Sequence, residues 1–351
     1  SGRFANTGYG THRLNCGNNG SYTMTKPTGL KDISTSNLTE ATVKDGGKYF
    51  DTILYEGNGA GQKVGQFQPV TETYTIADSL MVNGVDETLQ RTPGSTGNDN
   101  TWTISLWFKR SKLDADQRLF TCFSADALKQ VSLGFDSSNR MSFMTYDGGF
   151  QLKLLTTRTF GDTSQWVHVV AFYDDTVTTP GSSDCGLYIN GVQETVLTTS
   201  DYPSQNDGTT MNLGNLHWIG ASSESSGSTF YSGYYADFYI IDGTKQAASD
   251  FGEVDSTTNR WIPKDATGLT FGTNGVYLDY ADKNDLGDDE SGNGNDFTEV
   301  NIDTTNGSNQ FHDTPTRNFL TGDTSQKGSG VTVTNGGLTS TANGSGSEGI
   351  R

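Results

Sequence analysis

Side chains with oxygen donors are concentrated in a loop near residue 290, and their chemistry is that of a calcium site. The candidate ligands are Asp288, Asp289, Asn293, Asn295 and Asp296. Calcium prefers hard oxygen ligands, and the loop's glycines would let backbone carbonyls converge on the ion. The run 282–287 imitates the start of an EF-hand loop, but Leu286 cannot ligate at the fifth position and Asn293 replaces the bidentate glutamate at the twelfth. Calcium is one interpretation, and a loop of Asx turns satisfied by its own side chains is the favoured alternative.

A second set of residues has the chemistry of a sugar-binding surface, in which aromatic rings stack on the sugar and a few polar groups orient it. The candidates are Trp107, Tyr231, Tyr235, Asp237 and Tyr239. Alternation along a strand at 232–241 predicts that Tyr235, Asp237 and Tyr239 share one face, with Tyr231 extending the stripe. Trp107 stands alone on the polar face of another strand. The alternative is that these aromatic side chains pack between sheets or against a neighbouring subunit.

No arrangement of residues predicts catalysis. Glycoside hydrolysis uses two carboxylates that flank the scissile bond, which a Glu-x-Asp-x-x-Glu strand would supply. Glu253-Val254-Asp255 begins such a motif, but Thr258 occupies its last position. The four histidines are scattered, and His168 lies in an apolar run that predicts a hydrogen-bonded core residue. We therefore predict that the chain is not an enzyme, and polysaccharide hydrolase is the least favoured alternative.

Charge and cysteine content restrict the partners. The 351 residues carry a formal net charge of −18, which would repel nucleic acid and anionic membrane surfaces. Three cysteines without Cys-x-x-Cys spacing do not form a disulfide framework. Cys122 and Cys185 lie in strand-like runs and are predicted to be small buried thiols, which suits assembly in a reducing compartment. No signal peptide or membrane-spanning run is visible, so no membrane insertion is expected.

The elements that must position these residues are short strands separated by turns rich in glycine and asparagine. Predicted strands lie at 79–82, 88–92, 101–110, 118–123, 131–135, 141–146, 151–155, 166–173, 187–189, 216–220, 232–241 and 275–280. Their spacing predicts an all-β fold, an antiparallel β-sandwich of the jelly-roll type. The strand at 166–173 is apolar on both faces, and Asn190-Gly191 suits a type I′ hairpin turn. The residues predicted to seal the two layers are Trp102, Leu106, Trp166 and Phe172.

Composition shifts divide the chain into four segments. The predicted divisions are an N-terminal arm with a short hairpin at 1–72, the sandwich at 73–252, a loop-rich extension at 253–327 that completes or packs on the sandwich, and a low-complexity tail at 328–351 that leads to a further module.

Several stretches resemble laminin-G-like, concanavalin-A-like lectin-fold domains. The matching motifs, in order, are Leu80-Met81-Val82-Asn83-Gly84, Trp102–Arg110, Trp166–Val170, Leu187–Val192, Trp218-Ile219-Gly220 and Ser232–Ile241. In related sandwiches calcium also binds in the loop before the last core strand, so the resemblance adds Glu224 to the calcium candidates.

A narrower resemblance is to structural proteins of marine bacteriophages that carry this domain. It rests on runs such as Tyr202–Asn206, Trp261–Lys264, Asp289–Thr298 and Asp313–Phe319. In such proteins the domain often lies between SPRY-like modules, which 27–55 and 330–351 resemble in part. The resemblance implies a non-enzymatic virion-surface protein, as a tail fibre, spike or capsid-attached fibre, that is assembled in the host cytoplasm.

The partners that this resemblance implies are other virion proteins and copies of the chain itself, with a host-surface glycan as a further ligand. The alternative is a purely architectural module that joins subunits and binds no glycan. No cofactor other than calcium is expected.

Overall fold

The computed structural model divides the chain into two units, residues 1–71 and 72–351. In the first unit it describes only two hairpins, formed by the strands β1 (Gly2–Ala5), β2 (Thr11–Leu14), β3 (Ile53–Tyr55) and β4 (Gln62–Val64). In the second unit it describes residues 74–124, 129–222, 229–256, 258–304, 308–318, 330–334 and 339–342. Apart from those strands, the predicted arm and its SPRY-like stretch lie outside the described residues, as do Cys16, Glu224 and most of the predicted tail.

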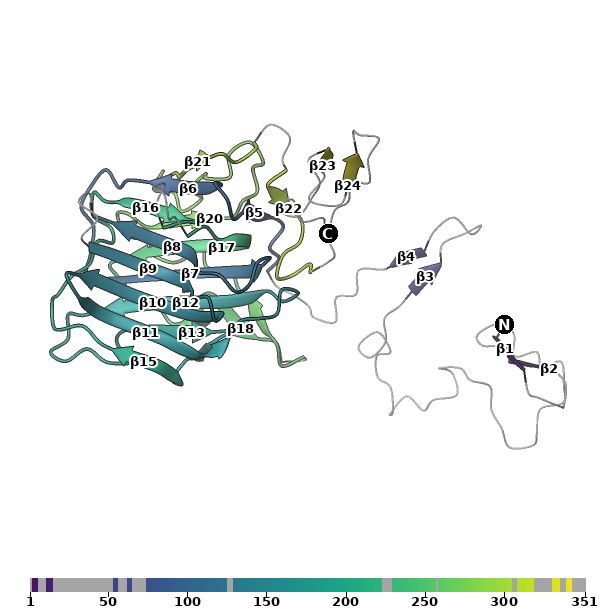
Figure 1. Cartoon of the computed structure of the whole chain (residues 1–351), viewed down its shortest axis with the longest axis horizontal. Coiled ribbons are helices and arrows are strands. Elements are labelled where there is room, and N and C mark those ends of the chain that lie inside the picture. The colour runs from purple at the N-terminus through teal and green to yellow at the C-terminus, as the bar shows by residue number, and fades with distance from the viewer. Residues whose placement is uncertain are drawn as a thin grey trace. The chain divides into compact units, whose positions relative to one another are not determined.

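Two large antiparallel sheets face each other in the second unit (Figure 1). Sheet I has the strand order β15-β11-β10-β9-β8-β16-β6-β21. Its strands are β6 (Thr88–Arg91), β8 (Gln117–Phe123), β9 (Lys129–Phe135), β10 (Arg140–Asp147), β11 (Phe150–Thr159), β15 (Leu197–Asp201), β16 (Leu216–Ile219) and β21 (Thr298–Val300).

Sheet II has the order β14-β13-β12-β7-β17-β5-β22, and β20 pairs with β17. Its strands are β5 (Ser79–Asn83), β7 (Thr101–Arg110), β12 (Val167–Asp174), β13 (Gly186–Ile189), β14 (Val192–Gln193), β17 (Ser232–Asp242), β20 (Val276–Leu278) and β22 (Gln310–Phe311).

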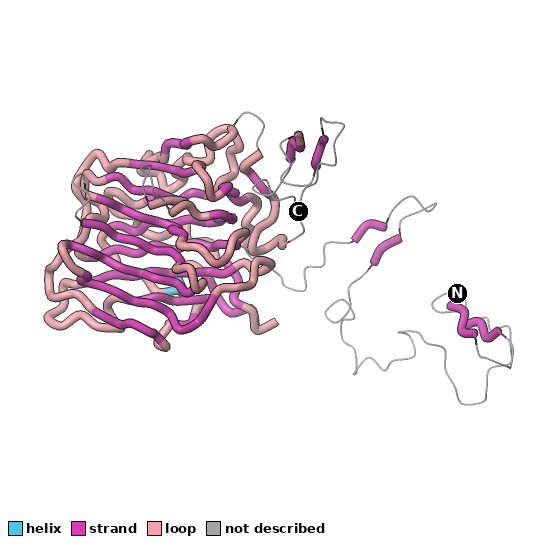
Figure 2. The backbone as a smooth tube through the Cα atoms, in the orientation of Figure 1, coloured by secondary structure: helices cyan, strands magenta, loops and turns pink. Residues whose placement is uncertain are grey.

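Two hairpins and one short helix complete the described elements. They are β18 (Gly252–Val254) with β19 (Trp261–Pro263), β23 (Val331–Thr334) with β24 (Thr339–Ala342), and the 3₁₀ turn η3 (Ala248–Asp250). Loops join the strands throughout (Figure 2). The predicted fold class, an all-β antiparallel sandwich of jelly-roll, concanavalin-A-like form, is confirmed.

The core between the sheets contains two of the four residues predicted to seal it. Trp102 and Leu106 on β7 are fully buried there, and Trp102 stacks on Tyr173 of the neighbouring β12 with ring centroids 5.2 Å apart. Because Tyr173 faces this core and side chains alternate along a strand, Phe172 must face the other way. Trp166 likewise packs in a cluster on the outer face of sheet II. The prediction that Trp166 and Phe172 seal the two layers is therefore wrong.

The outer face of sheet II is covered by the chain's own C-terminal part. Phe251, Phe271 and Tyr277 pack against Val170 and Tyr239 there. A second cluster on the same face, which includes Trp107, contains Phe311 and Val331. Strand β12 is consequently buried on both faces, as its sequence predicts.

A β-bulge in β17 reverses the alternation of its side chains. Ala236 lies opposite Trp107, but Tyr239 lies opposite Ser105, so β17 has one residue more than β7 at this point. The bulge contains Asp237, whose φ of 45° is in the left-handed region that aspartate tolerates better than most residues. Beyond the bulge every side chain turns to the opposite face of the sheet. The prediction that Tyr235 and Tyr239 share a face is therefore wrong.

The buried Asp237 carboxyl predicts a pH dependence of stability. Burial raises its pKa from 3.8 to about 7, so between these values the folded chain retains a proton that the unfolded chain has lost. Stability should therefore fall as pH rises from about 4 to about 7, by up to about 1.4 kcal/mol per pH unit. Asp237→Asn keeps the acceptor for Tyr277 and tolerates the positive φ, and it should remove the contribution of Asp237 to the slope.

Urea denaturation at pH 5, 6, 7 and 8 measures that slope. Glu87, whose pKa burial also raises to about 7, should maintain a smaller slope in the variant. Asp201→Asn, at an exposed position on β15, is the matched control and should behave as the wild type. An unchanged slope in Asp237→Asn would show that this carboxyl is not the titrating group.

Candidate functional site

Two of the predicted sugar-binding residues face the core between the sheets. Tyr231 and Tyr235 are 0% exposed. The Tyr231 hydroxyl donates to the carbonyl of Lys109 at 2.8 Å, and the Tyr235 hydroxyl donates to the carbonyl of Leu119 at 3.0 Å. Both rings therefore serve packing, and neither has a free face for a sugar.

Two further members of the predicted stripe are buried on the other side of sheet II. Tyr239 stacks on Tyr277 with ring centroids 4.4 Å apart and planes within 1° of parallel. The Tyr277 hydroxyl donates to Asp237 at 3.2 Å and contacts the hydroxyl of Tyr74 at 2.9 Å. The prediction of one exposed aromatic stripe is thus corrected, because the bulge separates its members and the extension covers them.

Trp107, the fifth candidate, lies on the outer face of sheet II as predicted and lines a cleft of about 540 Å³. Only 4% of its surface is exposed. We call this the tryptophan cleft, and its lining residues are Trp107, Gln165, Trp166, Asn190, Asn259, Arg260, Trp261, Pro315 and Asn318. They come from β7, the segment before β12, the β13–β14 turn, the β18–β19 hairpin and the segment after β22.

Two of the lining indoles form one wall of the tryptophan cleft and stack on a buried histidine that lies between them. His168 lies between Trp107, at a centroid distance of 4.8 Å, and Trp261, at 6.0 Å. The Trp261 indole N–H donates to His168 Nδ1 at 3.0 Å, so Nδ1 is unprotonated and Nε2 donates to Ser105 Oγ at 2.9 Å. Burial lowers the pKa of His168 to about 3, which keeps the imidazole neutral and this wall intact at ordinary pH. The prediction of a hydrogen-bonded core histidine is confirmed.

The third indole is fixed by a buried ion pair. Trp166 Nε1 donates to Asp313 Oδ1 at 3.1 Å, and the other oxygen of Asp313 pairs with Lys109 at 2.6 Å. Lys109 also donates to Asn318 Oδ1 at 3.0 Å. Asp313 is 0% exposed, and its ion pair with Lys109 neutralises its charge inside the protein.

The rim of the tryptophan cleft is polar and contains no carboxylate among its lining residues. Gln165, Asn190, Asn259 and Asn318 supply amides that both donate and accept hydrogen bonds, and Arg260 supplies the one cation of the lining set. Asn190 is oriented by the strand beside it, since its Oδ1 accepts from the backbone N–H of His168 at 2.8 Å. The cleft thus combines apolar ring surfaces with neutral hydrogen-bonding groups.

The calcium candidates form a loop that satisfies its own polar groups. Asp289 accepts four hydrogen bonds, from the backbone N–H groups of Tyr277, Ser291 and Asn295 and from the Ser291 hydroxyl, at 2.8–3.0 Å. Asn293 and Asn295 donate to backbone carbonyls, and Asp296 accepts from the N–H of Asp289 at 3.2 Å. Such a network is what the Asx-turn alternative predicts.

Calcium binding at this loop stays a prediction. The surroundings of the loop change the pKa of one of its carboxyl groups. Asp288 is exposed, and its pKa is raised, chiefly by desolvation and then by the neighbouring Asp285. Within the described parts of the chain, no group of three or more His, Cys, Asp or Glu side chains is placed to hold a metal ion.

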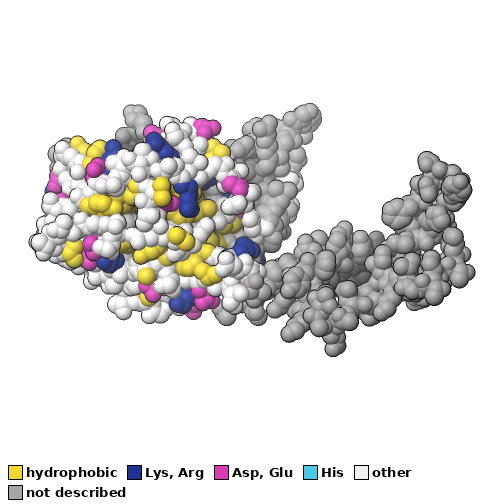
Figure 3. Space-filling view, turned by 90° about the horizontal axis from the view of Figure 1, so that it is seen from below, with side chains coloured by type: hydrophobic (Ala, Val, Ile, Leu, Met, Phe, Trp, Pro, Cys, Tyr) yellow, Lys and Arg dark blue, Asp and Glu magenta, His cyan; other side chains and the backbone are white. Residues whose placement is uncertain are grey.

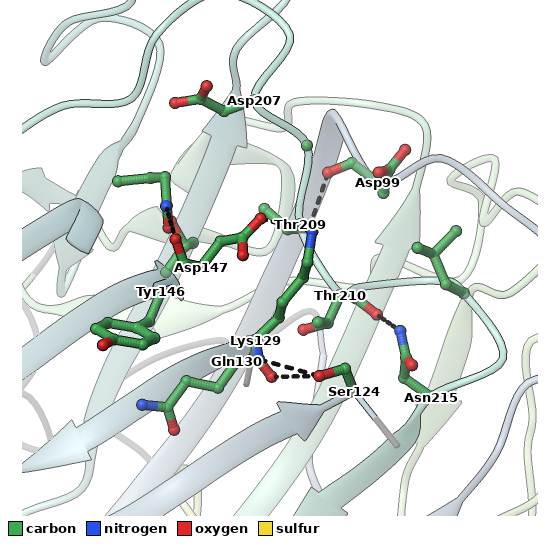
Figure 4. A pocket seen from close by; sticks show the side chains of 14 residues that line it. Asp99, Ser124, Lys129, Gln130, Tyr146, Asp147, Asp207, Thr209, Thr210 and Asn215 are labelled. Atoms are coloured by element: carbon green, nitrogen blue, oxygen red, sulfur yellow. Dashed lines mark hydrogen bonds and ion pairs between the residues drawn. The ribbon is translucent and has the colours of Figure 1, made fainter. Parts of the chain in front are cut away.

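A second pocket, of about 320 Å³, lies where the segment 207–215 meets the ends of β9 and β10 (Figure 4). Asp99, Asp147 and Asp207 line it, and Lys129 extends into it and pairs with Asp147 at 2.5 Å. Tyr146 is its one aromatic lining residue. This pocket therefore lacks the several aromatic surfaces of the tryptophan cleft, and one of its carboxylates is already neutralised.

The surface around the strands shows no large region of one charge on the face seen in Figure 3. Acidic and basic side chains are scattered there among apolar ones.

Cys122 and Cys185 are buried free thiols, which confirms the prediction for both. Burial raises the pKa of each to about 12, so neither is a reactive thiolate. In the part of the chain that the structure describes, no helix is long and apolar enough to span a membrane.

Residues 83–249 match the family described as the concanavalin A-like lectin/glucanases superfamily, through its laminin-G-type model. This segment is similar to laminin-G-like domains. It contributes Trp107, Gln165, Trp166 and Asn190 to the tryptophan cleft, whereas the remaining lining residues lie C-terminal to the matched laminin-G-like segment. No curated protein matches the chain.

Solved structures similar to the chain have low sequence identity. A heptameric SAP-like pentraxin from Limulus polyphemus has a TM-score of 0.39 and 13% identity, over 55% of this chain and 94% of that one. A putative carbohydrate binding protein from Bacteroides ovatus has a TM-score of 0.45 and 15% identity, over 66% of this chain and 60% of that one. Tailspike protein 2 of an Escherichia coli O157:H7 bacteriophage has a TM-score of 0.32 and 12% identity, over 49% of this chain and 24% of that one.

Proposed function

We propose that the chain is a carbohydrate-binding protein that holds a saccharide in the tryptophan cleft. The observation that carries this proposal is the juxtaposition of three indoles with four side-chain amides in one hollow. Pyranose rings have apolar C–H faces, which pack on aromatic surfaces, and hydroxyl groups, which both donate and accept hydrogen bonds. Side-chain amides satisfy both needs, so the chemistry of the cleft suits a sugar.

The composition of the cleft favours binding over hydrolysis. A glycosidase needs two carboxyl groups about 5–9.5 Å apart across the bond that it cleaves. None of the described residues that line the cleft is Asp or Glu, and the nearby Asp313 is buried in its ion pair with Lys109. A saccharide in the cleft would therefore be held without being cut.

The proposed setting is the surface of a bacteriophage particle, where a glycan-binding domain would attach the virion to its host. Support for this comes from the resemblance of several sequence runs to phage structural proteins, among them Trp261–Lys264, whose first residue lines the cleft. Immunogold electron microscopy of particles with an antibody to this chain tests it. Labelled tails or capsids support the setting, and particles that carry the chain's gene but no label contradict it.

A glycan array probed with the full chain, with and without calcium, tests the binding function. We expect specific hits, and a saccharide that hits should change the tryptophan fluorescence because three of the chain's five tryptophans line the cleft. Hits that require calcium would support the Asp288–Asp296 loop as a metal site. An array that stays blank under both conditions would favour the architectural alternative.

A further inference from the structure

We propose that the saccharide carries a carboxylate, as uronic and sialic acids do, and that Arg260 binds this group at the rim of the tryptophan cleft. This inference rests on the proposed function and narrows its substrate class. Arg260 is exposed, and its guanidinium forms no ion pair or hydrogen bond with any residue that the structure describes. It is therefore a cation that the protein itself leaves available.

The hairpin that presents Arg260 is closed by its own hydrogen bonds. The N–H of Asp255 donates to the Arg260 carbonyl at 2.8 Å, and the N–H of Asn259 donates to the Asp255 carbonyl at 2.8 Å. The Asp255 carboxylate accepts from the backbone N–H of Thr258 at 2.6 Å and from its hydroxyl. The carboxylate of Asp255, the acidic residue nearest to Arg260 in the hairpin sequence, is thus engaged in the hydrogen bonds of the turn. Arg260 directly precedes Trp261, the first residue of β19.

A second cation near the cleft, Lys109, is neutralised. Lys109 pairs with the fully buried Asp313, which also accepts the Trp166 N–H. A ligand anion would have to compete with this pair for Lys109, whereas Arg260 has no such partner. The geometry therefore points to a single anionic group, bound at the Arg260 end of the cleft.

The lining of the cleft differs in charge from the chain as a whole. With 41 acidic and 23 basic residues, acidic side chains predominate over the sequence, yet no acidic side chain is among the lining residues that the structure describes. A guanidinium binds a carboxylate through two parallel hydrogen bonds, and the apolar indoles beside it weaken the competition from water. At physiological ionic strength the repulsion from the rest of the chain is screened beyond about 8 Å, so the local cation dominates.

The test compares acidic oligosaccharides with their own carboxyl-reduced forms, which keep the ring and lose the charge. The probes are oligogalacturonate, alginate and hyaluronan oligosaccharides and sialyllactose, titrated calorimetrically into the full chain. We expect at least one acidic probe to bind about tenfold or more tightly than its reduced form. Arg260→Gln should abolish that difference, so that the acidic probe binds the variant no more tightly than its reduced form does.

Arg158→Gln is the matched control, because it removes the same charge from an exposed arginine on β11 that does not line the cleft. It should bind every probe as the wild type does. Equal binding of acidic and reduced forms, or an Arg260→Gln variant that keeps the preference, overturns this inference and leaves the proposed function standing. Failure of all probes, acidic, reduced and neutral, together with a blank array, removes the proposed function as well.

Discussion

Replacing Trp102 by alanine is expected to lower the free energy of unfolding by about 3–5 kcal/mol. The side chain is 0% exposed, stacks on Tyr173 and meets Phe143 edge-on at 5.8 Å. Its indole N–H donates to Thr209 Oγ1 at 3.2 Å, which ties the sandwich to the loop after β15. Alanine would leave a cavity between the two sheets, and the rigid strands on either side could close it only in part.

Urea denaturation followed by circular dichroism measures this loss. Phe150→Ala is the control, since Phe150 is 48% exposed and its truncation should cost no more than about 1 kcal/mol. Trp102→Phe keeps an aromatic ring in the site and should give an intermediate loss even if the alanine variant fails to fold. A loss below about 1 kcal/mol for Trp102→Ala would show that the sheets are not sealed where the structure places the seal.

The orientation of β7 could be predicted because its alternation is regular from end to end. Trp102, Ile104, Leu106 and Phe108 alternate onto one face, and Trp107 lies on the other, as the sequence indicates. For β12 the sequence predicts burial of both faces but cannot say which face meets sheet I. A segment much later in the sequence covers the outer face. Trp166 and Phe172 are therefore buried there, and their apolar side chains cannot be told from core residues by sequence.

The side-chain pattern of β17 could not be predicted from its sequence. One additional residue at Asp237 reverses the alternation, and this residue is not a glycine that would mark the bulge. Composition was equally ambiguous in the loop at 288–296, because aspartates and asparagines suit a calcium ion and an Asx turn alike. The hydrogen bonds accepted by Asp289 show how the side chains of the loop are oriented.

The existence of the tryptophan cleft could not be predicted from the sequence either, because its lining residues come from separate elements. Trp107, Trp166 and Trp261 are far apart in the chain, and only the packing of the extension onto sheet II brings them together. The sequence predicts Trp107 as a binding candidate and Trp166 as a core residue, and it gives no local signal that Trp261 belongs to a binding site. The turn at Asn190-Gly191, which the sequence predicts, makes room for the Trp261 indole. A Cβ at Gly191 would lie 2.3 Å from the Trp261 ring.

Trp261→Ala is expected to weaken binding of a saccharide identified on the array by about 30-fold or more. Buried or half-buried tryptophans at the centre of a binding surface commonly contribute about 2 kcal/mol or more, and each 1.4 kcal/mol is a factor of ten in affinity. Trp261 is the partly exposed member of the aromatic wall, so it has more ring surface to offer a ligand than Trp107 at 4% or Trp166 at 9%. Its removal also leaves His168 Nδ1 without its donor, which adds a small cost in stability.

Two variants separate the loss of the ring from a loss of folding. Val254→Ala truncates an exposed apolar side chain directly opposite Trp261 in the β18–β19 hairpin, and it should bind as the wild type does. Trp261→Phe keeps a ring for stacking without the N–H, so it should retain most of the affinity and lose less stability than the alanine variant, which also loses the packing of the ring. Calorimetric titration and thermal denaturation of all three give both quantities. If Trp261→Ala folds and binds with wild-type affinity, the saccharide is bound elsewhere, because no sugar can use this cleft without contacting the indole that forms its open wall.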